Sequence, residues 1–166
     1  RPFWSIKLLM LNYIKRFLVI FFINFIDQSI ADFAYDFLII LPLTFLAYSF
    51  YVYKSDKNIG GIEAFSVGLF IDLISDSYFG LNAIIFCLIT YVINLYANAF
   101  KLFSYLQVCL FFGFSSTVYI GFTQLVINLY DFSYLTLFIS SISNIIFCIL
   151  IAIIPAYFPK NIRMRI

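Results

Sequence analysis

The chain has 166 residues, of which 64% are hydrophobic and 22% aromatic but only 11% charged, and its mean hydropathy is +1.05. Soluble domains carry about 25% charged residues, so this composition excludes an ordinary soluble fold and indicates an integral membrane protein. The chain contains no histidine, which excludes Ser-His-Asp triads, Cys-His dyads and imidazole metal sites, and its net charge of +2 is too small to indicate nucleic-acid binding.

Apolar runs between the charged residues predict an all-α protein, a six-helix transmembrane bundle that forms a single transmembrane domain over residues 1–166. Each span needs about 20 apolar residues to cross the hydrocarbon core, so a chain of this length has room for no more than about six. The chain begins at Arg1 instead of Met, so we expect its natural start to lie upstream of Arg1. The predicted spans cover residues 8–26, 37–53, 61–78, 81–99, 104–127 and 134–157.

The first two predicted spans each contain residues that are unusual in a membrane helix, and an acidic segment joins them. In the first span, Lys15 and Arg16 can reach the headgroups with their long side chains. The second span contains Pro42, which lacks a backbone donor and is expected to kink the helix. The segment between the two spans carries Asp27, Asp32 and Asp36.

The basic residues predict how the chain crosses the membrane. Threading six spans back and forth places all 10 Lys and Arg residues on one side. By the positive-inside rule that side is the cytoplasm, so both termini are expected there. The opposite face then receives Asp27, Asp32, Asp36, Asp76 and Asp131.

Small and polar residues recur every four positions in three predicted spans, a pattern that lets helix backbones approach closely. The row in the third span is Gly60, Ala64, Gly68, Asp72, Asp76 and Gly80; in the fifth span it is Gly113, Thr117 and Gly121; in the sixth it is Ser140, Asn144, Cys148, Ala152 and Ala156. We interpret these rows as ordinary bundle packing in preference to a ligand pocket. The third, fifth and sixth spans are therefore expected to form the inner bundle, while the first two face lipid or a partner.

Asp72 is the strongest functional candidate in the chain. An ionised Asp near the centre of a membrane helix costs about 2.5 to 3.5 kcal/mol on insertion scales. Two interpretations stay open, a hydrogen-bond anchor to backbone amides or neighbouring polar side chains, and a proton or substrate site. An anchor would tolerate Asp72→Asn better than Asp72→Leu because Asn keeps an acceptor, whereas a titrating site would tolerate neither. The candidate hydrogen-bond partners are Asn94, Asn98 and Asn144.

Asp76 lies nearer the predicted outer interface than Asp72. We interpret it as a solvated boundary residue or, together with Ser75 and Ser77, as a cap for the fourth span.

The run from Gly68 to Leu81 resembles the signature of the MreD family of rod shape-determining membrane proteins. Its elements are a Gly four residues before the Asp, then Asp-Leu-x-Ser, a further Ser, and a Gly-Leu pair that opens an apolar helix. The residues that carry these elements are Gly68, Asp72, Ser75, Ser77, Gly80 and Leu81. Chain length, the basic loop after the second span and the basic C-terminus extend the resemblance over most of the chain. The chain departs from the family at Asp76, where a Gly usually stands between the two Ser residues.

This resemblance implies a non-enzymatic scaffold subunit of the cell-elongation machinery in the bacterial inner membrane, which helps to regulate peptidoglycan synthesis. The implied partners are membrane lipid and the bitopic protein MreC and, through the complex, MreB filaments and the peptidoglycan glycosyltransferase and transpeptidase pair. No cofactor, metal or nucleic acid is implied. The family is also similar in fold to the six-span substrate-binding subunits of energy-coupling-factor vitamin transporters.

Two alternatives fit the sequence less well. A vitamin-transporter subunit would need a polar pocket near the outer face and small residues on the first span, but that span is bulky from Phe17 to Ile23. An intramembrane aspartyl protease would pair Asp36 with Asp72, two carboxylates that could share a proton. Such proteases have Gly-x-Gly before the second Asp, whereas residues 69–71 are bulky here.

The predicted topology leads to a direct test. Reporter fusions placed after Lys57, Lys101 and Ile166 should all report the cytoplasm, because only six spans collect every basic residue on that side. A periplasmic signal from the fusion at Lys101 would contradict the arrangement.

Overall fold

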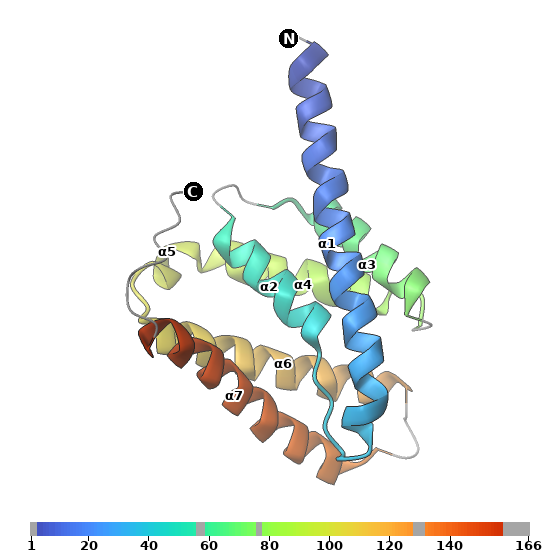
Figure 1. Cartoon of the computed structure of the whole chain (residues 1–166), viewed down its shortest axis with the longest axis vertical. Helices are drawn as coiled ribbons and strands as arrows, with labels where there is room; N and C mark the ends of the chain where they lie inside the picture. Colours follow the sequence, from blue (N-terminus) through green and yellow to red (C-terminus); the bar gives the residue numbers. More distant parts are fainter. Residues whose placement is uncertain (1–2, 56–58, 76–77, 128–131, 158–166) are drawn as a thin grey trace.

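The computed structural model describes residues 3–55, 59–75, 78–127 and 132–157, and within them all regular secondary structure is helical (Figure 1). The all-helical class that the sequence predicts is confirmed for this part of the chain. The helices are α1 (Phe3–Tyr35), α2 (Leu43–Lys54), α3 (Gly61–Ile74), α4 (Leu81–Leu95), α5 (Ala97–Phe100), α6 (Tyr105–Ile127) and α7 (Tyr134–Tyr157).

Two helical segments in the described part, Tyr105–Ile127 and Tyr134–Ile151, are long and apolar enough to cross a membrane. They favour a membrane protein. Helix α2 has 12 residues and α3 has 14, so at 1.5 Å per residue they extend about 18 and 21 Å, less than the core of about 30 Å. The six-span arrangement therefore stays a prediction.

The first connection differs from the one that the sequence predicts. Helix α1 continues through Asp27 and Asp32 to Tyr35, because charge alone does not end a helix and no Gly or Pro interrupts it. Helix α2 begins only at Leu43, with Pro42 at its N-cap instead of kinking its interior. The clash of a proline ring with the residue before it disfavours helix there, and the connector, residues 36–42, is not helical beyond a short turn.

The predicted fourth span is also divided. Helix α4 ends at Leu95, and after Tyr96 the short helix α5 continues the chain. The remaining predicted starts agree with the structure to within one residue, since α3, α4, α6 and α7 begin at residues 61, 81, 105 and 134.

The expectation that the third, fifth and sixth spans form the inner bundle holds for the contact between the fifth and sixth but is wrong for the third. Helix α3 packs mainly against α4, and α6 packs against α7, while α2 contacts α1, α4 and α6 and so joins the two pairs. Aromatic side chains make this possible. The ring of Tyr48 on α2 stacks on Phe86 of α4 with the centroids 4.3 Å apart, and the ring centroid of the partly buried Phe50 lies 4.5 Å from that of Phe112 on α6. Helix α2 is thus central although its sequence predicts a peripheral span.

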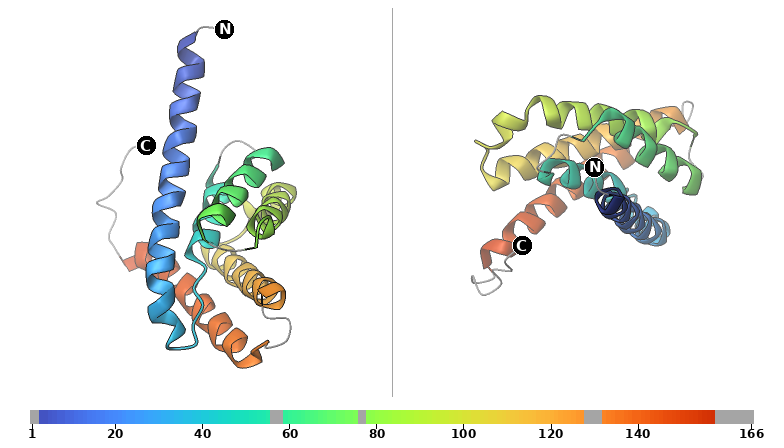
Figure 2. Two further views of the ribbon diagram at one scale, coloured as in Figure 1. Left: turned by 90° about the vertical axis from the view of Figure 1, so that its right-hand side faces the viewer. Right: turned by 90° about the horizontal axis from the view of Figure 1, so that it is seen from above.

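Helix α1 lies at the side of this assembly. Figures 1 and 2 show its N-terminal part projecting beyond the other helices, and its axis is steeply inclined to those of α4 and α6. Its exposed side chains include Leu18, Phe22 and Phe25. The expectation that the first span faces lipid or a partner agrees with this exposure, whereas near-parallel spans would not produce so steep a crossing.

The small-residue rows have different roles. A Cβ added at Gly68 would meet the Ala83 backbone at Cα and, at 2.6 Å, at its nitrogen, so Gly68 lets α3 and α4 touch. Gly113 does the same for α6 and α7, where its added Cβ would lie 3.3 Å from Ile145 Cα. Gly60 does not pack in this way, because it lies exposed at the N-cap of α3 with no described atom within 4 Å of an added Cβ.

Three further predicted packing residues lie as their rows imply. Ala64 is fully buried in α3. Thr117 hydrogen bonds Ser141 across the α6–α7 contact at 3.0 Å, and an added Cβ at Gly121 would lie 3.4 Å from Leu137 of α7.

Asn144, by contrast, serves the connector. Its Nδ2 donates to the carbonyl of Ile40 at 2.9 Å, and the Ser140 hydroxyl accepts from the Ile40 N–H at 2.9 Å. Leu38 in this segment has φ of 58°, which is uncommon for a residue other than Gly. The small polar side chains of α7 therefore form hydrogen bonds with the non-helical backbone of the connector.

The α3–α4 contact predicts unequal effects of two matched substitutions. Gly68→Ala should lower the free energy of unfolding by about 1 to 3 kcal/mol, because the new methyl group meets backbone that cannot move aside. Gly61→Ala on the same helix has no described atom near its added Cβ and should not destabilise the protein. Unfolding in detergent measures both, and equal stabilities would contradict the assigned contact.

Candidate functional site

The Asp72 carboxylate binds the N-terminus of the following helix. Its Oδ2 accepts from the backbone N–H of Gly80 at 2.9 Å and of Ala83 at 3.3 Å. Its Oδ1 accepts from the backbone and side-chain nitrogens of Asn82 at 3.0 and 2.9 Å. The side chain is 4% exposed, so a buried carboxylate on α3 caps α4 from outside that helix.

Local chain geometry makes this cap possible. The first N–H groups of a helix have no partner within it, and together they favour a negative charge. Gly80, the N-cap residue of α4, has φ of 93° and offers no side chain to cap the helix itself. Glycine adopts this conformation without strain, so the turn directs the α4 amides toward Asp72.

The structure therefore places Asp72 as an anchor to backbone amides. The Asn side chain that it engages is Asn82, not one of the three predicted partners. Asn94 donates to the carbonyl of Ile59, and Asn98 lies exposed on α5. Asn82 directly follows the Gly80-Leu81 pair, and a polar residue at the second position of an apolar helix is the sequence signal that could have identified it.

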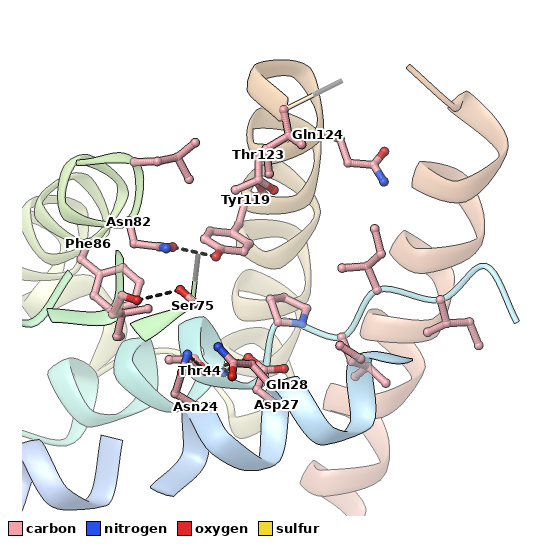
Figure 3. Close-up of a pocket in the computed structure, with 18 residues that line it drawn as sticks. Asn24, Asp27, Gln28, Thr44, Ser75, Asn82, Phe86, Tyr119, Thr123 and Gln124 are labelled. Carbon is pink, nitrogen blue, oxygen red and sulfur yellow. Dashed lines mark hydrogen bonds between the residues drawn. The ribbon is translucent and has the colours of Figure 1, made fainter. Parts of the chain in front are cut away.

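Asn82 extends the anchor to a third helix. The Tyr119 hydroxyl on α6 donates to Asn82 Oδ1 at 2.7 Å, and its ring stacks on Phe45 of α2 at 4.6 Å. Figure 3 shows the Asn82 and Tyr119 side chains directed at each other. One polar chain thus links α3, α4 and α6, and aromatic stacking extends it to α2.

A second carboxylate caps α2 in the same manner. Asp27 Oδ2 accepts from the backbone N–H and the hydroxyl of Thr44 at 2.9 and 2.7 Å, and its Oδ1 accepts from the Leu43 N–H at 3.3 Å. Asn24 Nδ2 reaches the Thr44 hydroxyl at 3.4 Å. The sequence places Asp27 only in an acidic connection, because the charge of Asp27 does not show that α1 continues past it.

The other residues of the motif contribute less to this joint. The Ser75 hydroxyl donates to the carbonyl of Ile71 in its own helix at 2.6 Å. Asp76 and Ser77, predicted to cap the fourth span with Ser75, lie outside the described residues.

A cavity of about 410 Å³ lies between the two caps (Figure 3). The C-terminal parts of α1, α3 and α6, the N-terminal parts of α2 and α4, and the connector line it. Its labelled polar side chains are Asn24, Asp27, Gln28, Thr44, Ser75, Asn82, Tyr119, Thr123 and Gln124.

Nothing in the described ranges points to a metal centre, since no three His, Cys, Asp or Glu side chains there lie close enough together to hold an ion. Comparisons with protein-family models, with curated proteins and with solved structures find no match to this chain. The arrangement of side chains and the sequence motif are therefore the basis for any functional conclusion.

The cap geometry revises the expected tolerance for Asn at position 72. Both carboxylate oxygens face N–H donors, so Asp72→Asn places an NH₂ group against donors and should cost about 1 to 3 kcal/mol. Asp72→Leu removes every acceptor and should cost more. Asp36→Asn, at an exposed carboxylate, is the matched control and should change stability by no more than about 0.5 kcal/mol.

Unfolding in detergent tests this order. A stability of Asp72→Leu equal to that of the unsubstituted protein would contradict the anchor.

Proposed function

We propose that this chain is a multi-pass scaffold subunit of the bacterial inner membrane, with six spans and both termini in the cytoplasm. In this proposal it acts without catalysis, binds MreC, and through the complex meets MreB and the peptidoglycan glycosyltransferase and transpeptidase pair. Its role is to help regulate peptidoglycan synthesis during cell elongation.

One observation carries the proposal: the most characteristic residues of the MreD-like run have a structural use. Gly68 brings α3 against α4, Asp72 caps α4, and Gly80 makes the turn between them. A scaffold needs such a joint to hold its helices in one arrangement. An acid–base catalyst needs a carboxylate directed at a substrate, whereas both oxygens of Asp72 accept from the chain itself.

The outer surface supports a membrane location. Large apolar side chains are exposed on several helices, including Phe22 at 67%, Phe114 at 69% and Phe138 at 66%. Soluble monomers rarely expose broad apolar patches, whereas lipid tails solvate such side chains at no cost.

The cell-shape test uses a rod-shaped bacterium depleted of its own MreD protein. The chain, expressed together with MreC from the same genome, should restore rods and should co-purify MreC. Asp36→Asn should behave like the unsubstituted chain. Asp72→Leu should give round cells, and Asp72→Asn an intermediate shape, at normal membrane levels, because the joint is loosened in that order.

Failure of the unsubstituted chain to retain MreC would overturn the proposal. Full function of Asp72→Leu would remove its structural basis.

A second candidate is the substrate-binding subunit of an energy-coupling-factor type vitamin transporter. The cavity favours it, because a polar pocket near the outer face is what that class requires, and the helix ends lining this cavity face outward in the predicted topology. Mass spectrometry of the purified protein distinguishes the two functions. A stoichiometric vitamin would favour the transporter, and retained MreC without a vitamin would favour the scaffold.

A further inference from the structure

The cavity between the caps has the size of a small-molecule site. Its volume of about 410 Å³ falls within the range of about 300 to 1,000 Å³ that such pockets occupy. Among the described lining residues, Asp27 is the one Asp, Glu, Lys or Arg.

Two buried oxygen atoms of lining residues have no hydrogen-bond donor in the described part of the chain. They are Oδ1 of Asn24 and Oε1 of Gln124. Asn24 is 4% exposed. A buried acceptor without a donor costs free energy, and that cost is recovered when a ligand supplies N–H or O–H groups.

The charge of the cavity wall determines which hydrogen-bond donors a ligand can bring. Asp27 brings a carboxylate, and its Oδ1 accepts a single described bond, at 3.3 Å from Leu43 N, which leaves acceptor capacity on that atom. Since no basic side chain lines the described cavity, an anion would be repelled and a cation attracted.

The remaining walls are apolar. The side chains of Ile39, Leu41, Ile71, Phe86 and Ile127 contribute to them. A fitting molecule therefore has a compact apolar body as well as a charged donor.

We propose that this cavity binds a primary ammonium group carried on an apolar body, with Asp27 as the counter-ion and Asn24 and Gln124 as acceptors. Such a group is found on free alkylamines and on the ethanolamine headgroup of membrane lipids. The proposal rests on the residues that line the cavity, which under the transporter candidate would be the site of the substrate itself.

Binding to the full chain in nanodiscs of phosphatidylcholine tests the chemistry. Hexylamine should bind and raise the unfolding temperature, whereas hexanol and hexanoate, which share its apolar body, should bind at least about tenfold more weakly because they lack the positive charge. Equal binding of hexylamine and hexanol would overturn the proposal.

The site is tested by substituting an acceptor that does not cap a helix. Gln124→Met keeps the side-chain volume and should weaken hexylamine binding about tenfold, the change expected for one lost hydrogen bond to a charged group. Gln107→Met, the control, changes an exposed Gln near the other end of α6; it removes only the local bond from the Ser104 N–H to Gln107 Oε1 and should leave binding unchanged. Unaltered binding by Gln124→Met would place the amine elsewhere and overturn the assignment.

A last measurement distinguishes the two sources. Phosphatidylethanolamine added to the nanodiscs should displace hexylamine if the lipid headgroup occupies the cavity, whereas phosphatidylglycerol should not. Undisturbed hexylamine binding in both lipids would identify a free amine as the occupant and still supports the ammonium site. Displacement by phosphatidylglycerol alone would contradict the cationic preference.

Discussion

The arrangement of this chain depends on how the N-termini of its internal helices find acceptors in apolar surroundings. Helices α2 and α4 begin inside the assembly, with Pro42 and Gly80 at N-caps that supply no capping side chain. In each case a carboxylate from the preceding helix takes that role, Asp27 for α2 and Asp72 for α4. The N–H groups and the carboxylate would each be costly to bury alone, and together they satisfy one another. Each bond also fixes the position of one helix against the next, so capping and packing are a single interaction here.

The sequence was informative where the signal is local. An aspartate in an apolar run is expensive enough to require a partner, and a Gly four residues before it predicts a close approach. The structure brings Gly68 and Asp72 into the same α3–α4 contact. The partners themselves could not be predicted in this way, since neither Asn82 nor Tyr119 carries a charge that marks it, and their meeting depends on how α4 lies against α6.

Sequence periodicity could not predict which helices pack against each other. A row of small residues predicts that a helix is approached closely, but it does not identify the neighbour. The small residues of α3 pack against α4, and those of α6 pack against α7, so each row contacts the next long helix along the chain. The central place went to α2, whose aromatic residues Phe45, Tyr48 and Phe50 fill the space between the two pairs. Bulky aromatic helices were expected to face lipid, yet large rings that stack also fill a core well.

The connector before α2 shows why the polar row on α7 needs both small size and hydrogen-bonding groups. Non-helical backbone that is packed inside a protein needs partners for its N–H and C=O groups. Ser140 both accepts from the Ile40 N–H and donates to the carbonyl of Leu38, and Asn144 donates to the carbonyl of Ile40. A row of Ala or Gly on α7 would let the connector approach but would leave those backbone groups unpaired. Larger polar side chains would keep the connector away from α7. The predicted packing row is therefore also the group of side chains that lets α2 start at Leu43, where Asp27 can cap it.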